Sequence, residues 1–271
     1  MVRYVTSAGE EAVLDGPGGV HCSRGSALDW GYSVKELNGR LAMTALEPLE
    51  FSLAVSVSGP GAAHALDALA DALSADAASG SAGRLCVGEW YRRCVPLSMA
   101  HEWCQGDGAF LLELGFRADD PAWVRAEEVE LAPPDPAGLD FPHGFPHDYS
   151  PPAMTDSVRN RSPVPCPVRI RVQGPASDWS VRIGANAYSC DIPLIAGETA
   201  CIDGSDETIT VTRASGAVEN AFQTFKGTFR EGSGSYVFEA VPPGVSPVSW
   251  EGCSGVALTV YERRAEIGWS K

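Results

Sequence analysis

Two histidines and an aspartate form the most recognisable ligand-like group in the sequence. His143, His147 and Asp148 make the pattern His-x-x-x-His-Asp. On a helix, histidines four residues apart share a face, which is the arrangement that holds a metal ion. Here Pro142 and Pro146 precede the histidines, and proline inside a helix removes a hydrogen bond and clashes with the preceding turn. We therefore interpret the segment as a packed or solvated loop and expect no metal site.

The patterns that could supply a nucleophile are no stronger. A serine hydrolase with a nucleophile elbow needs Gly-x-Ser-x-Gly between a strand and a helix. The nearest approach, Gly-Cys-Ser-Gly at residues 252–255, precedes a predicted strand instead, so we interpret it as a turn. Cys104 and His101 are a conceivable Cys–His pair, but a separation of three residues does not bring two side chains together. A partly buried thiol is the simpler interpretation of Cys104.

Adjacent carboxylates and a glycine-rich turn also fail to assemble a site. A glycosidase needs two carboxyl groups that face each other across a cleft, whereas neighbouring residues of a strand point to opposite faces. We therefore expect the acidic pairs at 10–11, 119–120 and 127–128 to be solvated surface. Residues 59–61 (Gly-Pro-Gly) precede a helix but lack the lysine and serine of a phosphate loop. We predict no catalytic, cofactor-binding or metal-binding residues and a protein that is not an enzyme.

The elements around these residues are mostly strands. Residues 51–57 alternate apolar and small polar side chains, which is the period of a half-buried strand. A helix is predicted from Ala62 to about Ala78, with Leu66, Leu69 and Leu73 on one face. The other predicted strands cover 84–94, 109–117, 123–131, 168–172, 179–183, 187–195, 208–213, 236–241 and 256–263.

Proline density predicts where the chain divides. Ten of the 20 prolines lie between Pro133 and Pro167, and proline disfavours helix in itself and in its neighbour. We expect an N-terminal β-rich domain with one helix over 1–132, a proline-rich connector over 133–162, and a C-terminal β-sandwich over 163–271. The fold class is thus predicted to be mainly β.

The charge excludes two classes of partner. The chain carries a net charge of −15, and residues 1–150 hold 22 acidic and 9 basic side chains, against 13 and 11 in residues 151–271. Binding to nucleic acid or to an anionic membrane needs clustered Lys and Arg. We therefore expect neither stable nucleic-acid binding nor membrane association.

The cysteines and the N-terminus predict the compartment. The eight cysteines form no Cys-x-x-Cys pair, the first residues show no apolar signal-peptide core, and no run of about 20 apolar residues could span a membrane. We expect buried free thiols in a protein made in a reducing cytoplasm.

The second half of the sequence resembles a known family. Residues 160–175 contain prolines at 163, 165 and 167 and run through an apolar strand to a Gly-Pro turn. Ala-Gly-Glu at 196–198 and Cys-Ile-Asp-Gly at 201–204 follow. This succession resembles the second domain of the distal tail (Dit) proteins of long-tailed phages and prophages. The Phe-Pro repeats at 141–149 resemble the segment that the same family carries between its domains.

The first half matches the family in the order of its elements: a strand, an Ala/Leu-rich helix, and Phe116 followed by Pro121 and Trp123. The sequence departs from the family pattern after Asn160, where Arg161 and Ser162 replace an expected glycine. It also has no large insertion in the second domain.

The resemblance implies a structural role in a virion tail, for a protein made in the cytoplasm of the bacterial host. Six copies would form a ring through the first domain. The ring would join the tail tube protein to the tail-tip (tail-associated) protein and let DNA pass. The second domain would be galectin-like in fold. The acidic first half would then line the channel and repel the phosphate backbone.

An alternative function is a soluble carbohydrate-binding protein with a β-sandwich fold. Trp179, Trp250 and Trp269 lie on or near predicted strands of the second domain and would supply stacking faces for sugars. The opposing interpretation is that these tryptophans belong to the core or to an interface.

Overall fold

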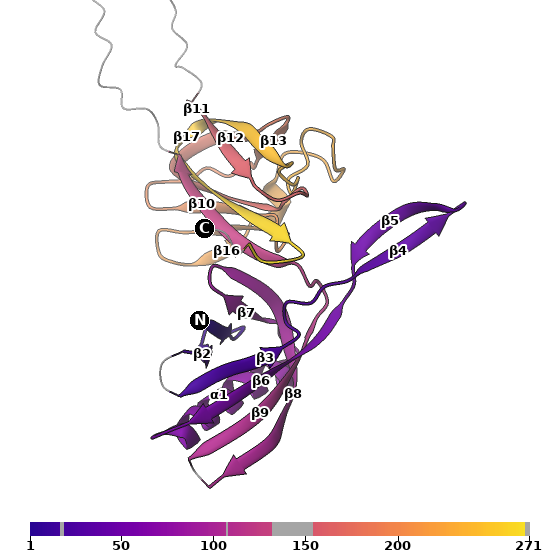
Figure 1. Cartoon of the computed structure of the whole chain (residues 1–271). Coiled ribbons are helices and arrows are strands. Elements are labelled where there is room, and N and C mark those ends of the chain that lie inside the picture. Colours follow the sequence, from indigo (N-terminus) through magenta and orange to yellow (C-terminus); the bar gives the residue numbers. More distant parts are fainter. Residues whose placement is uncertain (17–18, 107, 132–153, 269–271) are drawn as a thin grey trace, which may run out of the picture. The chain divides into compact units, whose positions relative to one another are not determined.

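The computed structural model describes residues 1–16, 19–106, 108–131 and 154–268. Contacts within the chain divide it into two units. Unit 1 comprises Met1–Arg125 and Arg264–Lys271, and unit 2 comprises Ala126–Arg263. Over the described residues the protein is mainly β with one α-helix, which confirms the predicted fold class (Figure 1).

Unit 1 consists of two antiparallel sheets that share one bent strand, β8. The first part of β8 pairs with β7 in the order β2-β1-β7-β8, and its second part pairs with β9 in the order β3-β6-β9-β8. The strands are β1 (Val2–Val5), β2 (Glu11–Asp15), β3 (Val20–Gly25), β6 (Leu49–Ser58), β7 (Gly83–Val87), β8 (Trp90–Gln105) and β9 (Ala109–Ala118).

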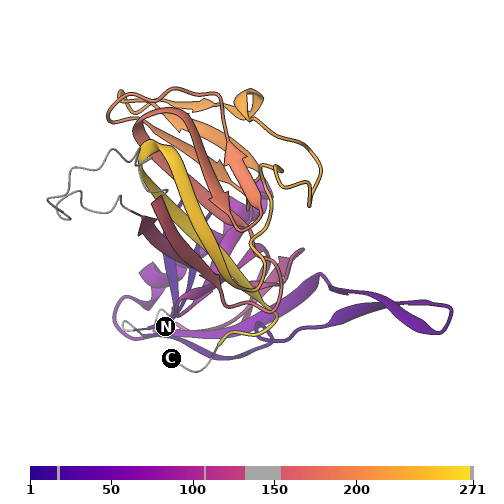
Figure 2. The same cartoon turned by 90° about the horizontal axis from the view of Figure 1, so that it is seen from above.

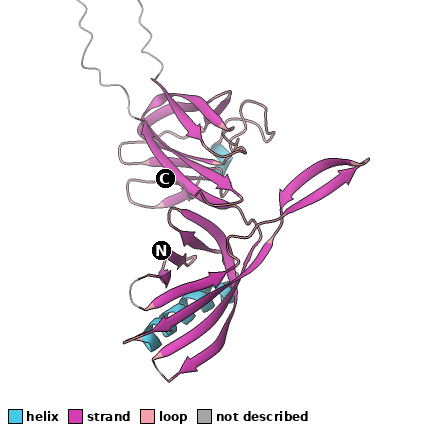
Figure 3. Ribbon diagram, in the orientation of Figure 1, coloured by secondary structure: helices cyan, strands magenta, loops and turns pink. Residues whose placement is uncertain are grey.

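The helix α1 (Ala62–Ser79) packs against these sheets and closes the core of unit 1 (Figure 3). Leu69 and Leu73 are buried and Leu66 packs against the same core, as the leucine spacing predicts. Gly61 precedes the helix and Gly80 ends it, both with a left-handed backbone. That conformation suits glycine because it lacks a Cβ atom.

A long hairpin leaves unit 1 between β3 and β6. It consists of β4 (Tyr32–Leu37) and β5 (Arg40–Leu46), which pair only with each other in a separate two-stranded sheet among the described strands. Figures 1 and 2 both show the hairpin extended away from the strands that carry it. We call this hairpin the arm.

Unit 2 is a two-layered β structure whose layers share two long strands. In one layer, residues 168–173 of β12 (Val168–Ile183) pair with β14 (Thr199–Asp203) and with β17 (Gly244–Arg264). In the other layer, residues 180–183 of β12 pair with β13 (Asn186–Ser189), and β17 pairs with β11 (Met154–Asn160). The register of β12 and β17 is interrupted on both sides of Ala176. Irregularities of this kind let a strand pass from one layer to the next.

The remaining elements extend the first layer. β15 (Thr208–Thr212) and β16 (Val218–Asn220) continue it beyond β14, and β10 (Trp123–Leu131) pairs with β17 on the other side. A short 3₁₀ helix, η1 (Phe222–Thr224), follows β16. The core between the layers includes Ile170, Val181, Tyr188, Ile202 and Leu258.

Several predicted strands are confirmed. The strands predicted over 168–172 and 179–183 are parts of one strand, β12, and the strand predicted over 256–263 is the end of the longer β17. Three other predicted segments differ for physical reasons. The strand predicted over 84–94 is a hairpin, β7 and β8, because Gly88 turns the chain with φ 61°. The strand predicted over 187–195 ends at Ser189, because the backbone beyond it bonds to a loop instead: Asp191 N–H donates to the Thr224 carbonyl at 2.7 Å. The segment predicted as a strand at 236–241 is a loop. The side chain of Asn186 binds both the N–H and the C=O of Tyr236, so these groups do not pair with another strand.

The predicted domain limits of 1–132, 133–162 and 163–271 stay predictions. Most of the predicted connector, including the His143, His147 and Asp148 motif, lies outside the described residues. The end of the connector segment holds a strand, β11, which pairs with β17 over its whole length.

Candidate interaction surface

The turn of the arm is a two-residue loop with a specific sequence requirement. Leu37 and Arg40 pair directly across it, and Asn38 and Gly39 both have positive φ, 53° and 69°. These are the backbone angles of a tight hairpin turn that matches strand twist, for which Asn-Gly is the preferred pair. The Asn-Gly pair therefore determines where the arm turns and how the residues beside the turn pair, while farther along the register shifts between Lys35 and Glu36.

The arm exposes large apolar side chains. Leu37 is 68% exposed, Leu41 is 64% exposed and Val34 is 56% exposed. At its base, Trp30 and Tyr32 are also exposed and lie edge to face, with ring centroids 5.6 Å apart. Apolar side chains gathered on one element mark an interaction site more reliably than scattered ones. A two-stranded hairpin is at best marginally stable alone in water, so a surface that covers the arm would stabilise it.

The arm is attached to unit 1 through a hydrogen-bonded loop. Ser26 N–H donates to the Ser52 carbonyl, and Ser26 Oγ accepts from Ser52 N–H at 3.2 Å. Glu47 N–H donates to the Gly31 carbonyl at 3.0 Å, which links the residue before β4 to the residue after β5. The arm therefore leaves the sheet from a defined position.

A buried arginine fixes the same loop from inside unit 1. Arg92 on β8 is fully buried, and its Nη1 donates to the Ala27 carbonyl. Its guanidinium lies over the ring of Trp123 at 4.5 Å and that of Phe51 at 5.8 Å. Burial lowers the pKa of Arg92 to about 10, so the group still carries its charge at neutral pH. The rings offset part of the cost of removing that charge from water.

The sequence-derived nucleophiles are not assembled into a site. His101 and Cys104 are both exposed on β8, and no hydrogen bond joins them among the described contacts. The segment interpreted as a turn at 252–255 lies inside β17, where Gly252 has φ 72°. Ser254 Oγ donates to the Gln173 carbonyl at 3.1 Å, which holds that irregular part of the strand.

The acidic pairs form ion pairs at the surface. Glu127 lies 2.6 Å from Arg161, Glu128 binds Arg171, and Asp119 lies 2.9 Å from Arg117. Within the described residues, no group of three or more His, Cys, Asp or Glu side chains is arranged to hold a metal ion.

The eight cysteines are unpaired, and their exposure varies. Cys86, Cys94, Cys166 and Cys190 are buried, whereas Cys104 is exposed, so its interpretation as a partly buried thiol is wrong. Burial raises the pKa of the Cys94 and Cys190 thiols to about 12, which makes both thiols unreactive at neutral pH.

The tryptophans proposed as sugar platforms are placed in the core where they are described. Trp179 is buried and donates from Nε1 to the Ile192 carbonyl at 3.1 Å, and Trp250 is also buried. Trp269 lies outside the described residues. The carbohydrate-binding alternative therefore loses two of the three stacking faces on which it depends.

Sequence reasoning missed the arm, although one signal for it was present. Asn38-Gly39 between apolar residues is the strongest short-range indication of a hairpin. The sequence does not indicate that Leu37 and Leu41 are exposed, because apolar residues alternate in the same way on a strand with a buried face and on a strand exposed to solvent.

Comparison with solved structures shows the same fold in phage tail proteins. The structure of SPP1 Dit, described as a paradigm of the hub adsorption apparatus of phages that infect Gram-positive bacteria, matches with a TM-score of 0.56 and 10% identity. The match covers 97% of this chain and 98% of that one. Two structures of the phage P2 baseplate in its activated conformation, with Ca and with Sr, match with TM-scores of 0.63 and 0.64. Identity is again 10%, over 98% of this chain and 100% of theirs.

The predicted resemblance to distal tail proteins is therefore confirmed at the level of the fold. No protein-family model and no curated protein sequence matches the chain. Among the described helices, none is both long and apolar enough to cross a membrane.

Proposed function

We propose that this chain is a distal tail protein, a structural hub that joins the tail tube of a phage or prophage to its tail-tip proteins. The observation that carries the proposal is the likeness of fold to SPP1 Dit over nearly the full length of both chains. A shared fold does not by itself fix function. The exposed arm adds an independent reason to expect assembly.

In this proposal the arm connects neighbouring copies of a ring. The contact would be head to tail, because the arm of one copy covers a different surface on unit 1 of the next. Head-to-tail contacts generate closed rings when the rotation between copies closes. Six copies would complete the ring and leave the second unit of each chain available to other tail proteins.

The charge of the chain supports a passage for DNA. Residues 1–150 carry 13 more acidic than basic side chains, within a total of −15. A channel lined with carboxylates repels the phosphate backbone, so DNA passes without adhering. The ring would thus carry the genome out of the virion without forming a stable complex with it.

The role of the arm is tested by introducing charge on its apolar side chains. We expect the double variant Leu37→Asp/Leu41→Asp to remain monomeric over a concentration series in which the wild-type chain associates, because burying a carboxylate is strongly unfavourable. Sedimentation velocity measures the association. Val218→Asp, at a side chain of unit 2 that is 66% exposed, is the control and should associate like the wild type.

Association of the Leu37→Asp/Leu41→Asp variant to the same extent as the wild type would contradict the proposed role of the arm. Circular dichroism of the variant should match that of the wild type, since both side chains are exposed in the folded chain.

A further inference from the structure

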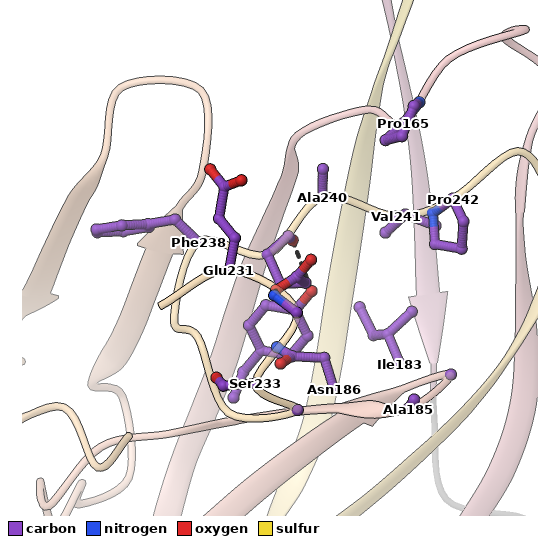
Figure 4. A pocket seen from close by; sticks show the side chains of 15 residues that line it. Pro165, Ile183, Ala185, Asn186, Glu231, Ser233, Phe238, Ala240, Val241 and Pro242 are labelled. Atoms are coloured by element: carbon purple, nitrogen blue, oxygen red, sulfur yellow. Dashed lines mark hydrogen bonds between the residues drawn. The ribbon is translucent and has the colours of Figure 1, made fainter. Parts of the chain in front are cut away.

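Unit 2 contains a pocket of about 560 Å³, a volume in the range of sites that hold small ligands. It lies where β12 turns into β13, under the loops that carry residues 231–234 and 238–242. Its apolar walls include Ile183, Val241 and Pro242 (Figure 4).

The polar groups in the walls are already used to build the pocket. Asn186 donates from Nδ2 to the Tyr236 carbonyl at 2.8 Å and accepts from Tyr236 N–H at 3.1 Å. Tyr188 donates from its hydroxyl to the Glu239 carbonyl at 2.7 Å. The loop is therefore held in place before any ligand arrives.

The charge of the pocket has one sign. Glu231 and Glu239 are the charged residues among the described side chains that line it. Glu239 accepts from Gly232 N–H through Oε2 at 2.7 Å, which fixes that carboxylate beside the loop. The negative charge near the pocket also affects Tyr236. Its pKa is raised first by burial and then by the charges of Glu207, Glu231 and Glu239.

An aromatic surface continues from the pocket. Phe238 lines the pocket and stacks on Phe222 with ring centroids 6.0 Å apart. The ring centroid of Phe229 lies 6.3 Å from that of Phe222 and 4.9 Å from that of Phe225. Phe229 is 75% exposed, so the cluster ends in a large apolar side chain that water surrounds.

We propose that this pocket binds a segment of a partner protein that places an arginine or lysine side chain in the field of Glu231 and Glu239, both of which line it. The apolar residue next to it would cover the cluster of Phe222, Phe225, Phe229 and Phe238. A cationic group attached to an apolar stem suits a pocket with apolar walls and two carboxylates.

The chemistry favours a segment of another protein over the alternatives. A small molecule confined to the pocket would leave Phe229 in water, whereas a segment covers both the pocket and the cluster. This chain has a sequence pI of about 4.7, and an acidic copy is a poor source of a basic segment for an acidic pocket. The inference is independent of the ring, since it uses residues of unit 2 alone.

The experiment uses a matched series of small probes and NMR spectra of the full chain. Benzamidine carries a cationic group on a ring, benzamide is its neutral counterpart, and benzoate is its anionic counterpart. We expect benzamidine to shift the amide signals of Gly232 and Gly234 and the side-chain amide of Asn186 in a saturable way. Benzamide should bind more weakly, and benzoate should bind least.

Two double variants separate the pocket from general charge effects. Glu231→Gln/Glu239→Gln removes both carboxylates while leaving an acceptor for Gly232 N–H, and we expect it to weaken benzamidine binding by about threefold to tenfold. Glu102→Gln/Glu113→Gln removes two exposed charges of unit 1 that do not line the pocket. This control should bind benzamidine like the wild type.

Four results would overturn the proposal. One is the absence of saturable shifts at Gly232 and Gly234 with benzamidine. Another is equal binding of benzamidine and benzoate. The third is saturable binding of galactose or N-acetylglucosamine at the same amides, which would make the pocket a saccharide site. Loss of self-association in Glu231→Gln/Glu239→Gln would assign the pocket to a second copy of this chain and would also overturn it.

Discussion

The buried residue Asp76 shows how one carboxyl group ties the N-terminal strand to the helix. Tyr4 donates its hydroxyl hydrogen to Asp76 at 2.7 Å, and Ser7 donates from its backbone N–H at 2.9 Å and from its hydroxyl at 2.6 Å. Asp76 is 2% exposed. It lies three residues after Leu73, on the apolar face of α1, so the helical period placed it in the core. The sequence does not reveal its partners, because Tyr4 and Ser7 are distant in the chain.

We expect Asp76→Ala to lower the free energy of unfolding by about 1–3 kcal/mol or more, since it leaves buried donors without an acceptor. Asp71→Ala removes an exposed aspartate of the same helix and should change stability by less than about 0.5 kcal/mol. Urea denaturation followed by tryptophan fluorescence measures both. Equal stability of the two variants would show that the Asp76 network contributes little.

At the scale of elements, the sequence predicted the strands and the helix that are determined by the pattern of neighbouring residues. The alternation from Phe51 to Val57 and the leucine spacing of α1 correspond to β6 and to the helix within two residues at each end. The long strands β12 and β17 could not be predicted, because each changes layers at an irregular point near Ala176. That bend depends on pairing between segments that are far apart in the chain, such as Ala176 with Cys253.

The turn of the arm provides a prediction at this scale. Gly39→Val places a β-branched residue at φ 69°, a conformation that costs about 1–2 kcal/mol for a residue with a Cβ atom. We expect faster amide hydrogen exchange over residues 32–41 and weaker association, with little change in the unfolding midpoint. Asn38→Gly accepts the same backbone conformation and serves as the control.

Unchanged hydrogen exchange in the arm of Gly39→Val would mean that the turn does not determine the arm. Equal acceleration of exchange in the arm and in β6 would indicate instead that the arm and the sheet unfold together.

At the scale of the whole molecule, this chain has the same fold as solved phage proteins with which it shares only 10% sequence identity. The sequence features that indicated the family are local, such as the prolines before β12 and the Gly-Glu at 197–198. The backbone N–H of Ile195 donates to Glu198 Oε2 at 3.1 Å, so this glutamate has a defined structural task in its turn. The candidate interaction surfaces could not be predicted in the same way, because exposure and the shape of a pocket depend on the whole fold.

The proposed function requires that copies of this chain form a ring through unit 1. Cryo-electron microscopy of the purified chain at high concentration tests it most directly. We predict rings of six copies with an open centre, a particle mass six times that of the 28.6-kDa chain, and the arm of each copy seated on unit 1 of its neighbour. Particles that stay monomeric at every concentration, or rings in which the arm contacts no neighbouring copy, would contradict the proposed ring.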